Sequence, residues 1–213
     1  MFLHDIDYDK FDIACEDTLV SPRHWDDEPF EVIVSNPPYS IKWAGDDNAL
    51  LINDPRYSPA GVLAPKSKAD YAFLLHGFYH LKNAKSSTMA IVLPHGVLFR
   101  GAAEGVIRKT LLKNGSIYAV IGLPSNMFYN TSIPTCIIVL KKQRDGRDVL
   151  FIDASKKFNK GKKQNEMTDE HIEAVMDLYS KRETVEKESF LASFEDIEKN
   201  DFNLNIPRYV DTF

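Results

Sequence analysis

Residues 30–39 read Phe-Glu-Val-Ile-Val-Ser-Asn-Pro-Pro-Tyr, an apolar run that ends in a polar turn. The β-branched residues at its centre predict a strand over residues 30–35. A residue before a proline is pushed to an extended backbone, and each proline fixes its own φ, so Asn36-Pro37-Pro38-Tyr39 leaves the strand as a stiff turn. Open α/β sheets bind their ligands at the carboxyl ends of strands, which is where this turn lies.

The sequence around this run alternates short apolar strands with helical stretches. Further strands are expected at residues 11–15, 88–93, 116–123 and 135–140. Several of them are apolar on consecutive residues, which is typical of strands covered on both faces in parallel sheets. Residues 70–82 and 102–113 carry apolar side chains at helical spacing, and Gly115 can end the second helix. This alternation predicts an α/β protein with a doubly wound sheet.

Two segments depart from the alternation. Residues 43–67 contain three prolines and two glycines with few apolar anchors, and they are long for a connection, so we expect a mobile lid or a functional loop. Beyond residue 140 the composition changes: residues 156–163 are basic, and Thr168 and Ser193 look like helix starts. We therefore divide the chain into a main α/β domain, residues 1–150, and a carboxy-terminal arm or small subdomain, residues 151–213.

Composition excludes several classes of protein. The 213 residues are 44% hydrophobic and 27% charged, which argues against a disordered chain, and no uncharged apolar run approaches the ~20 residues of a membrane span. The net charge of −5 argues against a chain that grips nucleic acid over its whole surface, although a local DNA contact remains open. Cys15 and Cys136 both lie in apolar runs, so we expect reduced, buried thiols in a cytoplasmic protein.

Two kinds of site are not expected. None of the 10 glycines is separated from another by a single residue, so no G-x-G loop is present, and a conventional dinucleotide site or P-loop is absent. His76 and His80 have the i, i+4 spacing of a helical metal site. No third ligand accompanies them, and we expect no metal.

The chemistry of the polar turn is specific. Pro37 and Pro38 have no N–H group, so this part of the main chain offers only carbonyl acceptors, and the side-chain oxygen of Asn36 adds another. Rigid acceptors suit a planar amino group with two N–H donors. Tyr39 supplies a flat face on which a ring can stack. The turn is therefore shaped for an aromatic amine such as an adenine flipped out of a duplex.

Asn36-Pro37-Pro38-Tyr39 resembles the catalytic motif of amino-directed DNA methyltransferases that use S-adenosylmethionine. Other stretches resemble the methyltransferase subunits of type I restriction-modification systems over essentially the whole chain. These stretches are residues 68–76, 91–99, 107–109, 122–124 leading to Phe128-Tyr129, 168–172 and 203–209. The resemblance implies a Rossmann-like S-adenosylmethionine-dependent methyltransferase sheet, incomplete at its amino-terminal side, with a helical carboxy-terminal arm. Residues 1–150 would then be a partial methyltransferase catalytic domain.

The resemblance also implies roles for residues. Asn36 and the Pro37 carbonyl would hold the amino group of the target adenine, Pro38 completes the stiff motif, and Tyr39 would stack on the base. The methyl group would pass directly to the adenine nitrogen, with no covalent enzyme intermediate. Glu16-Asp17-Thr18-Leu19 resembles the motif that closes the adenine pocket of the cofactor, so Asp17 is the candidate cofactor-binding residue, although an acid there can equally cap a turn.

The family's glycine-rich cofactor loop has no counterpart in this chain, so we expect a fragment of a methyltransferase subunit that binds S-adenosylmethionine weakly or not at all when alone. The implied partners are DNA and the specificity and restriction subunits of a type I system, with residues 151–213 docking on the specificity subunit. The basic residues 156–163 could contact DNA phosphate or form a solvated loop. Two alternative functions stay open: an inactive remnant that only binds partners, and a methyltransferase acting on another amine such as a protein glutamine.

Overall fold

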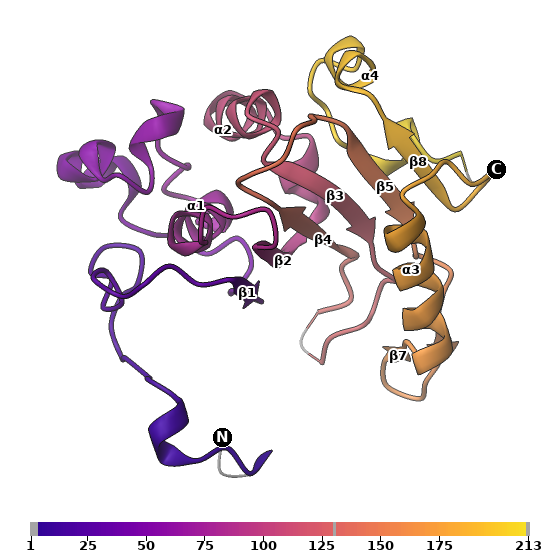
Figure 1. Ribbon diagram of the computed structural model, residues 1–213, viewed down its shortest axis with the longest axis horizontal. Helices are drawn as coiled ribbons and strands as arrows, with labels where there is room; N and C mark the ends of the chain where they lie inside the picture. The colour runs from indigo at the N-terminus through magenta and orange to yellow at the C-terminus, as the bar shows by residue number, and fades with distance from the viewer. Residues whose placement is uncertain (1–3, 130, 212–213) are drawn as a thin grey trace.

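The computed structural model describes residues 4–129 and 131–211, and this part of the chain forms a six-stranded sheet in the order β1-β2-β4-β3-β5-β8 (Figure 1). The strands of this sheet are β1 (Val32–Ser35), β2 (Thr88–Pro94), β3 (Ile117–Gly122), β4 (Thr135–Leu140), β5 (Val149–Asp153) and β8 (Ser189–Ala192). A separate two-stranded hairpin consists of β6 (Asn159–Lys160) and β7 (Asn165–Glu166). The helices are α1 (Asp70–His80), α2 (Ala102–Lys113), α3 (Asp169–Lys181) and α4 (Phe194–Lys199).

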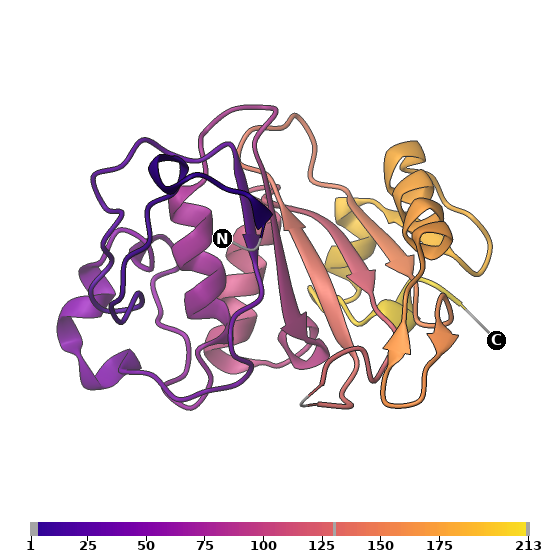
Figure 2. The ribbon, with the colours of Figure 1, turned by 90° about the horizontal axis from the view of Figure 1, so that it is seen from below.

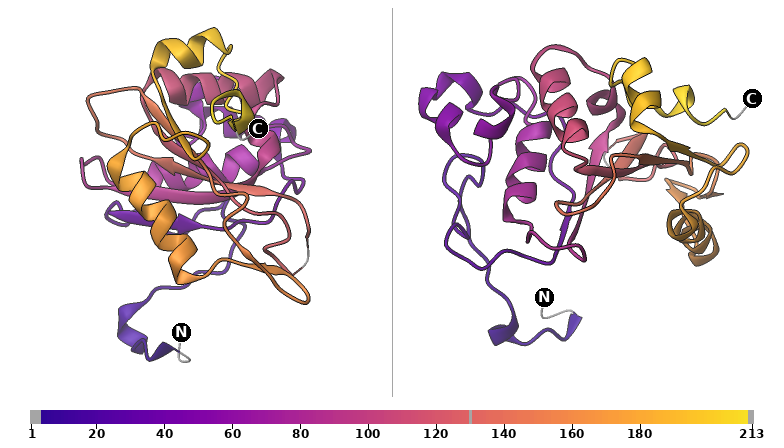
Figure 3. Two further views of the ribbon diagram at one scale, coloured as in Figure 1. Left: turned by 90° about the vertical axis from the view of Figure 1, so that its right-hand side faces the viewer. Right: turned by 45° about the horizontal axis from the view of Figure 1, so that its top comes forward.

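Helices cover both faces of the sheet, as the consecutive apolar residues predict. On β5, Val149 and Phe151 join the core under α1, α2 and α4, whereas Leu150 and Ile152 join the core under α3. Figure 3 shows α3 on the opposite side of the sheet from α4. Successive side chains of a strand point to opposite faces, so a strand between two helical layers is apolar throughout.

The directions of the strands differ in part from the predicted parallel sheet. The strands β1, β2, β3 and β5 run one way, but β4 lies antiparallel between β2 and β3, and β8 is antiparallel to β5. The apolar pattern indicates that a strand is buried on both faces, and a strand is buried in this way whether it runs parallel or antiparallel to its neighbours. Direction depends instead on the connections, and the link between β3 and β4 turns the chain straight back.

The predicted strand at residues 11–15 is wrong. These residues are not in strand conformation in the described part of the chain, and Ile13 and Cys15 are exposed. The run is short and flanked by acidic residues, so it buries too little apolar surface to join the sheet. The expectation of two buried thiols therefore holds only for Cys136, where burial raises the pKa of the thiol to about 12.

Residues 43–67 fold into short 3-10 turns at Gly45–Asp47, Ala49–Asn53 and Ser58–Ala60. Their buried residues, among them Leu51 and Tyr57, join the main core, so this segment packs on the domain rather than projecting as a loop. The boundary expected between residues 150 and 151 falls inside β5, and the carboxy-terminal segment also supplies β8 to the same sheet. The helix starts at Thr168 and Ser193 are confirmed, each with a capping box.

β1 is an edge strand of the described sheet and pairs only with β2. Its residues Val32 and Val34 are 68% and 79% exposed.

None of the helices in the described residues has the length and apolar character needed to cross a membrane.

Candidate active site

The polar turn lies at the carboxyl edge of the sheet. β1 and β2 are parallel and in register, with Ser35 opposite Ile91, so Asn36 leaves the sheet close to the point where β2 ends. β3 and β5 end at the same edge. Pro37 is buried and Asn36 is exposed, so the motif is anchored at its first proline and presents its amide outward.

The side chains of Asn36 and Tyr39 contact each other directly. The Tyr39 hydroxyl group donates a hydrogen bond of 2.6 Å to Oδ1 of Asn36. Burial raises the pKa of Tyr39, as does the nearby Cys136, so the hydroxyl group stays protonated and remains a donor at neutral pH. The structure therefore brings together the predicted acceptor and the predicted stacking ring.

A second aromatic ring faces this pair. Phe128, in the link between β3 and β4, lies with its ring centroid 6.2 Å from that of Tyr39 and at an interplanar angle of 69°. Such an edge-to-face arrangement is favourable, and it supports the Tyr39 ring, whose hydroxyl group bonds to the Asn36 amide. The sequence reasoning placed Phe128 only within a resembling stretch. An aromatic residue in the link after a neighbouring strand was the signal that could have identified it.

The link that carries Phe128 is tied to the β6–β7 hairpin. The backbone N–H of Asn165 donates to the Asn126 carbonyl at 2.8 Å, and Nδ2 of Asn165 donates to the Ser125 carbonyl at 2.8 Å. Figure 2 shows this link and the hairpin side by side at the edge where β1 and β2 end. The basic residues 156–163 therefore lie at the same edge of the sheet as Asn36.

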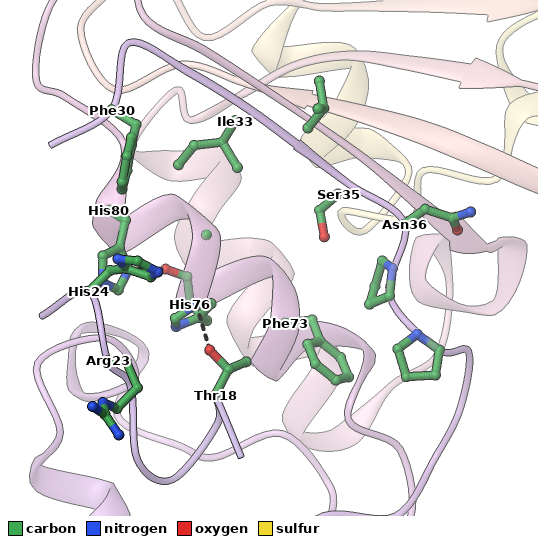
Figure 4. Close-up of a pocket in the computed structure, with 14 residues that line it drawn as sticks. Thr18, Arg23, His24, Phe30, Ile33, Ser35, Asn36, Phe73, His76 and His80 are labelled. Carbon is green, nitrogen blue, oxygen red and sulfur yellow. Dashed lines mark hydrogen bonds between the residues drawn. The ribbon is translucent and has the colours of Figure 1, made fainter. Parts of the chain in front are cut away.

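A cavity of about 460 Å³ lies on the other side of the polar turn. It runs along β1 between α1 and the segment that follows Asp17, and its walls include Thr18, Phe73 and His76. Figure 4 shows Phe73 between Thr18 and the turn, with the Asn36 side chain directed away from both. Asn36, Pro37 and Pro38 thus form one wall of the cavity, while the Asn36 amide points away from it, which suits a reaction between two ligands that approach from opposite sides.

One wall of the cavity is held by a buried arginine. Arg56 donates from Nη1 to the Thr18 carbonyl at 2.7 Å and to Nδ1 of His76 at 3.0 Å. Arginine is only a donor, so Nδ1 of His76 accepts, and Nε2–H donates to the Thr18 hydroxyl oxygen at 3.3 Å. Burial, the neighbouring His80 and Arg56 lower the pKa of His76 to about 4, which keeps the ring neutral.

Asp17 lies beside this cavity and is exposed. Its Oδ1 accepts from the N–H of Leu19 at 3.1 Å, while its carbonyl accepts from the N–H groups of Val20 and Ser21. The side chain thus closes its own turn and sets the position of Thr18, which does line the cavity. Its contact with a cofactor stays a prediction.

Histidines offer little to a metal here. Both ring nitrogens of His76 already have partners, so the pair with His80 can chelate only by breaking those hydrogen bonds. Among the described residues, Asp12, His24 and Asp27 bring three possible ligand atoms within 4.8 Å of one another. Both carboxylates are exposed, and such groups often gather without an ion.

Comparison with known proteins gives a consistent result. The family model described as N-6 DNA Methylase matches residues 1–213. The methylase subunit of the type I restriction enzyme MpnII from Mycoplasma pneumoniae is 43% identical over 223 residues, covering 100% of this chain and 40% of that protein. The MjaVII methylase subunit from Methanocaldococcus jannaschii is 33% identical, covering 99% of this chain and 37% of that protein.

A solved structure extends the comparison to three dimensions. The type I restriction-modification methyltransferase subunit from Streptococcus thermophilus superposes with a TM-score of 0.95 at 57% identity. The match covers 99% of this chain and 45% of that one. The chain therefore spans less than half the length of these relatives, and the correspondence is close over the part that it spans.

Proposed function

Because the chain belongs to the N-6 DNA methylase family, we propose that it supplies the target-base part of a type I restriction-modification methylase subunit. Its sheet is the Rossmann-like sheet of S-adenosylmethionine-dependent methyltransferases. The proposed reaction is methyl transfer to the exocyclic amino group of an adenine flipped out of DNA. The observation that carries this proposal is the Asn36 amide at the carboxyl end of β1, with the Tyr39 hydroxyl group hydrogen-bonded to it.

The proposed mechanism uses the turn as a rigid acceptor. Oδ1 of Asn36 and the Pro37 carbonyl accept the two hydrogens of the amino group, which directs the nitrogen lone pair out of the ring plane. Tyr39 stacks on the base, and its ring is supported by the edge-to-face contact with Phe128. When bound, S-adenosylmethionine would supply an electrophilic methyl group in exchange for its sulfonium bond, and the methylated amino group would release its extra proton to solvent. The main contribution of the protein is proximity and orientation.

The cavity beside the turn fits the adenine end of the cofactor. Its apolar wall at Phe73 can take a flat ring, and Nε2 of His80, one of the residues lining the cavity, is a buried nitrogen without a hydrogen-bond partner among the described residues. Asp17 and Thr18 would bound this end. Since the chain contains no G-x-G loop, we expect only weak S-adenosylmethionine binding by the purified chain. Calorimetric titration tests this, and micromolar binding would contradict it.

DNA is the proposed substrate, and the β6–β7 hairpin is the proposed phosphate contact. Lys160, Lys162 and Lys163 are exposed there, whereas Lys157 pairs with Glu188 at 2.7 Å. Each phosphate that a lysine neutralises makes DNA affinity more dependent on salt. Replacing the three exposed lysines with glutamine should make DNA affinity less dependent on salt concentration. If the slope of affinity against salt concentration is unchanged, the hairpin is a solvated loop that does not contact phosphate.

The specificity and restriction subunits are proposed as protein partners, with the specificity subunit docking on residues 151–213. On α3, Val175 and Leu178 face the core, whereas Ile172 and Met176 are exposed, so the helix retains an unburied apolar strip. Ile172→Glu should weaken binding of a specificity subunit. Val106→Glu, at an exposed apolar position on α2, is the matched control. The cytoplasmic location inferred from the sequence remains a prediction.

The decisive experiment is a chimera in which these 213 residues replace the matching segment of the Streptococcus thermophilus subunit. The chimera, with its specificity subunit, is incubated with DNA and S-adenosylmethionine, and nucleosides are analysed for N6-methyladenine. We expect methylation, and we expect Asn36→Ala to abolish it. Methylation that survives in Asn36→Ala would overturn the assignment of Asn36, and a folded chimera without activity would favour an inactive remnant.

A further inference from the structure

The buried carboxylate of Asp70 is not explained by the helix that it begins. Asp70 is the first residue of α1 and is 0% exposed. A carboxylate there ordinarily caps or complements the helix N-terminus. The N-cap residue of α1 is Ala69, which has no polar side chain, and the hydrogen bonds of the Asp70 oxygens run to Ser40 and Arg100.

Both oxygens of Asp70 face the catalytic turn. The backbone N–H of Ser40 donates to Oδ1 at 2.7 Å, and the Ser40 hydroxyl group donates to Oδ2 at 3.2 Å. Ser40 directly follows Tyr39. Next to this contact, the Ala69 N–H donates to the Ile41 carbonyl at 2.8 Å, so the chain leaving the motif is fastened to the start of α1 at two successive residues.

Ser40 adopts a conformation that its side chain disfavours. Its φ of +50° lies in the left-handed region, where residues with a Cβ atom are strained. The charge-assisted hydrogen bonds from Ser40 to Asp70 compensate for that strain. Without them, Ser40 can relax toward the right-handed or extended regions, and the direction in which the preceding Tyr39 ring projects would change with it.

We propose that Asp70 is a positioning residue of the active site, which holds Ser40 in the left-handed conformation and so fixes the Asn36–Tyr39 turn. This inference rests on the proposed function of that turn. Asp70 need not touch substrate or cofactor, because it acts through the backbone of Ser40.

The neighbouring charges supply a matched control. Arg100 donates from Nη2 to Oδ2 of Asp70 at 2.8 Å and from Nε to Oε1 of Glu104 at 2.8 Å. Partial burial opposes the charge of Arg100, but its bonds to Glu104 and Asp70 raise its pKa. Glu104 is therefore a second buried carboxylate on the same arginine, and no hydrogen bond joins it to Ser40 in the described part of the chain.

The test uses the chimeric methylase with its specificity subunit, and it compares Asp70→Asn with Glu104→Gln. We expect Asp70→Asn to lower kcat by roughly 10- to 100-fold while KM for DNA changes less than about threefold, because misplacement of reacting groups acts mainly on the chemical step. Glu104→Gln should lower Tm but keep kcat within about threefold of the parent. Equal losses of kcat in both variants would show a merely structural role.

A second-site change separates positioning from packing. Glycine adopts the left-handed region freely, so Ser40→Gly added to Asp70→Asn should restore kcat to within about fivefold of the parent. Absence of rescue in a folded double variant would overturn the proposal. If Asp70→Asn does not fold, the variants Ser40→Val and Ser40→Gly test the proposal instead. Ser40→Val should have a kcat at least tenfold lower than that of Ser40→Gly. Equal kcat values would reject a role for the conformation of Ser40 in positioning the turn. Failure of the unmutated chimera to methylate would instead reject the proposed function.

Discussion

The Tyr39 hydroxyl group donates its hydrogen bond to the same Asn36 oxygen that is proposed to accept the amino group of the target base, at a distance of 2.6 Å. The turn is therefore closed on itself by this hydrogen bond. An entering amino group must displace the Tyr39 hydroxyl group before it reaches Oδ1. The ring of Tyr39 and its hydroxyl group thus have opposite effects on base binding, and they can be separated by mutation.

Tyr39→Phe keeps the stacking ring and removes the competing donor. We expect its kcat/KM for methyl transfer to equal or exceed that of the parent chimera. Tyr39→Ala removes the ring, and loss of about 1–3 kcal/mol of stacking should lower kcat/KM by roughly 5- to 150-fold. Steady-state kinetics on the same DNA measures both variants. A loss in Tyr39→Phe as large as that in Tyr39→Ala would show that the hydroxyl group itself takes part in the reaction.

Arg56→Met should destabilise the fold. The Arg56 side chain is buried and bonds to Asp54 and to the carbonyls of Thr18 and Leu19. Removing one member of a buried ion pair leaves the other uncompensated, so we expect the free energy of unfolding to fall by about 3–5 kcal/mol. Urea denaturation measures this change.

The control for Arg56→Met is Lys66→Met in the same segment. Lys66 pairs with Asp47 at 2.9 Å, but both side chains lie mostly in solvent. Solvent screens such a pair, so its loss should leave the urea midpoint essentially unchanged. Equal shifts in the two variants would contradict the assignment of Arg56 as the buried anchor of residues 43–67.

Stability should fall as the pH drops from about 6.5 to about 4 because of His76. Its pKa is about 4 in the folded chain, below the ordinary histidine value of 6.5. In that window the unfolded state binds a proton that the folded state does not, so acid favours unfolding. The contribution is fully present above pH 6.5, is lost toward pH 4, and amounts to no more than about 3 kcal/mol. His76→Asn should flatten the slope of unfolding free energy against pH, and an unchanged slope would assign it to other groups.

The exposed edge of β1 should make the chain associate with itself. Val32 and Val34 are exposed on a strand whose outer edge pairs with no strand among the described residues, and unprotected edges template further pairing. We expect light scattering to show concentration-dependent association that Val34→Lys reduces. Val106→Lys, at an exposed position on α2, should leave it unchanged. The same reduction in both variants would indicate a general charge effect.

The sequence predicted the positions of helices and strands more reliably than it predicted which of them lie next to one another. The apolar runs around Val34, Ile91 and Val120 identified β1, β2 and β3 because local patterning reports burial. The same reasoning failed at residues 11–15, which form no strand and leave Ile13 exposed, and on the direction of β4, which depends on the connection from β3. Phe128 was missed as a neighbour of Tyr39 because their meeting requires two strand ends that are distant in the sequence.

The sequence alone determined the stiffness and acceptor character of Asn36-Pro37-Pro38-Tyr39, because prolines fix their own backbone and that of the preceding residue. It also determined that this turn follows a strand. Only the tertiary structure decided that the carboxylate of Asp70, at the start of α1, accepts hydrogen bonds from Ser40, and that Arg56 reaches Thr18 and His76. Local propensities act over a few residues, whereas the partner of a buried charge is selected by whichever polar groups packing brings within hydrogen-bond distance.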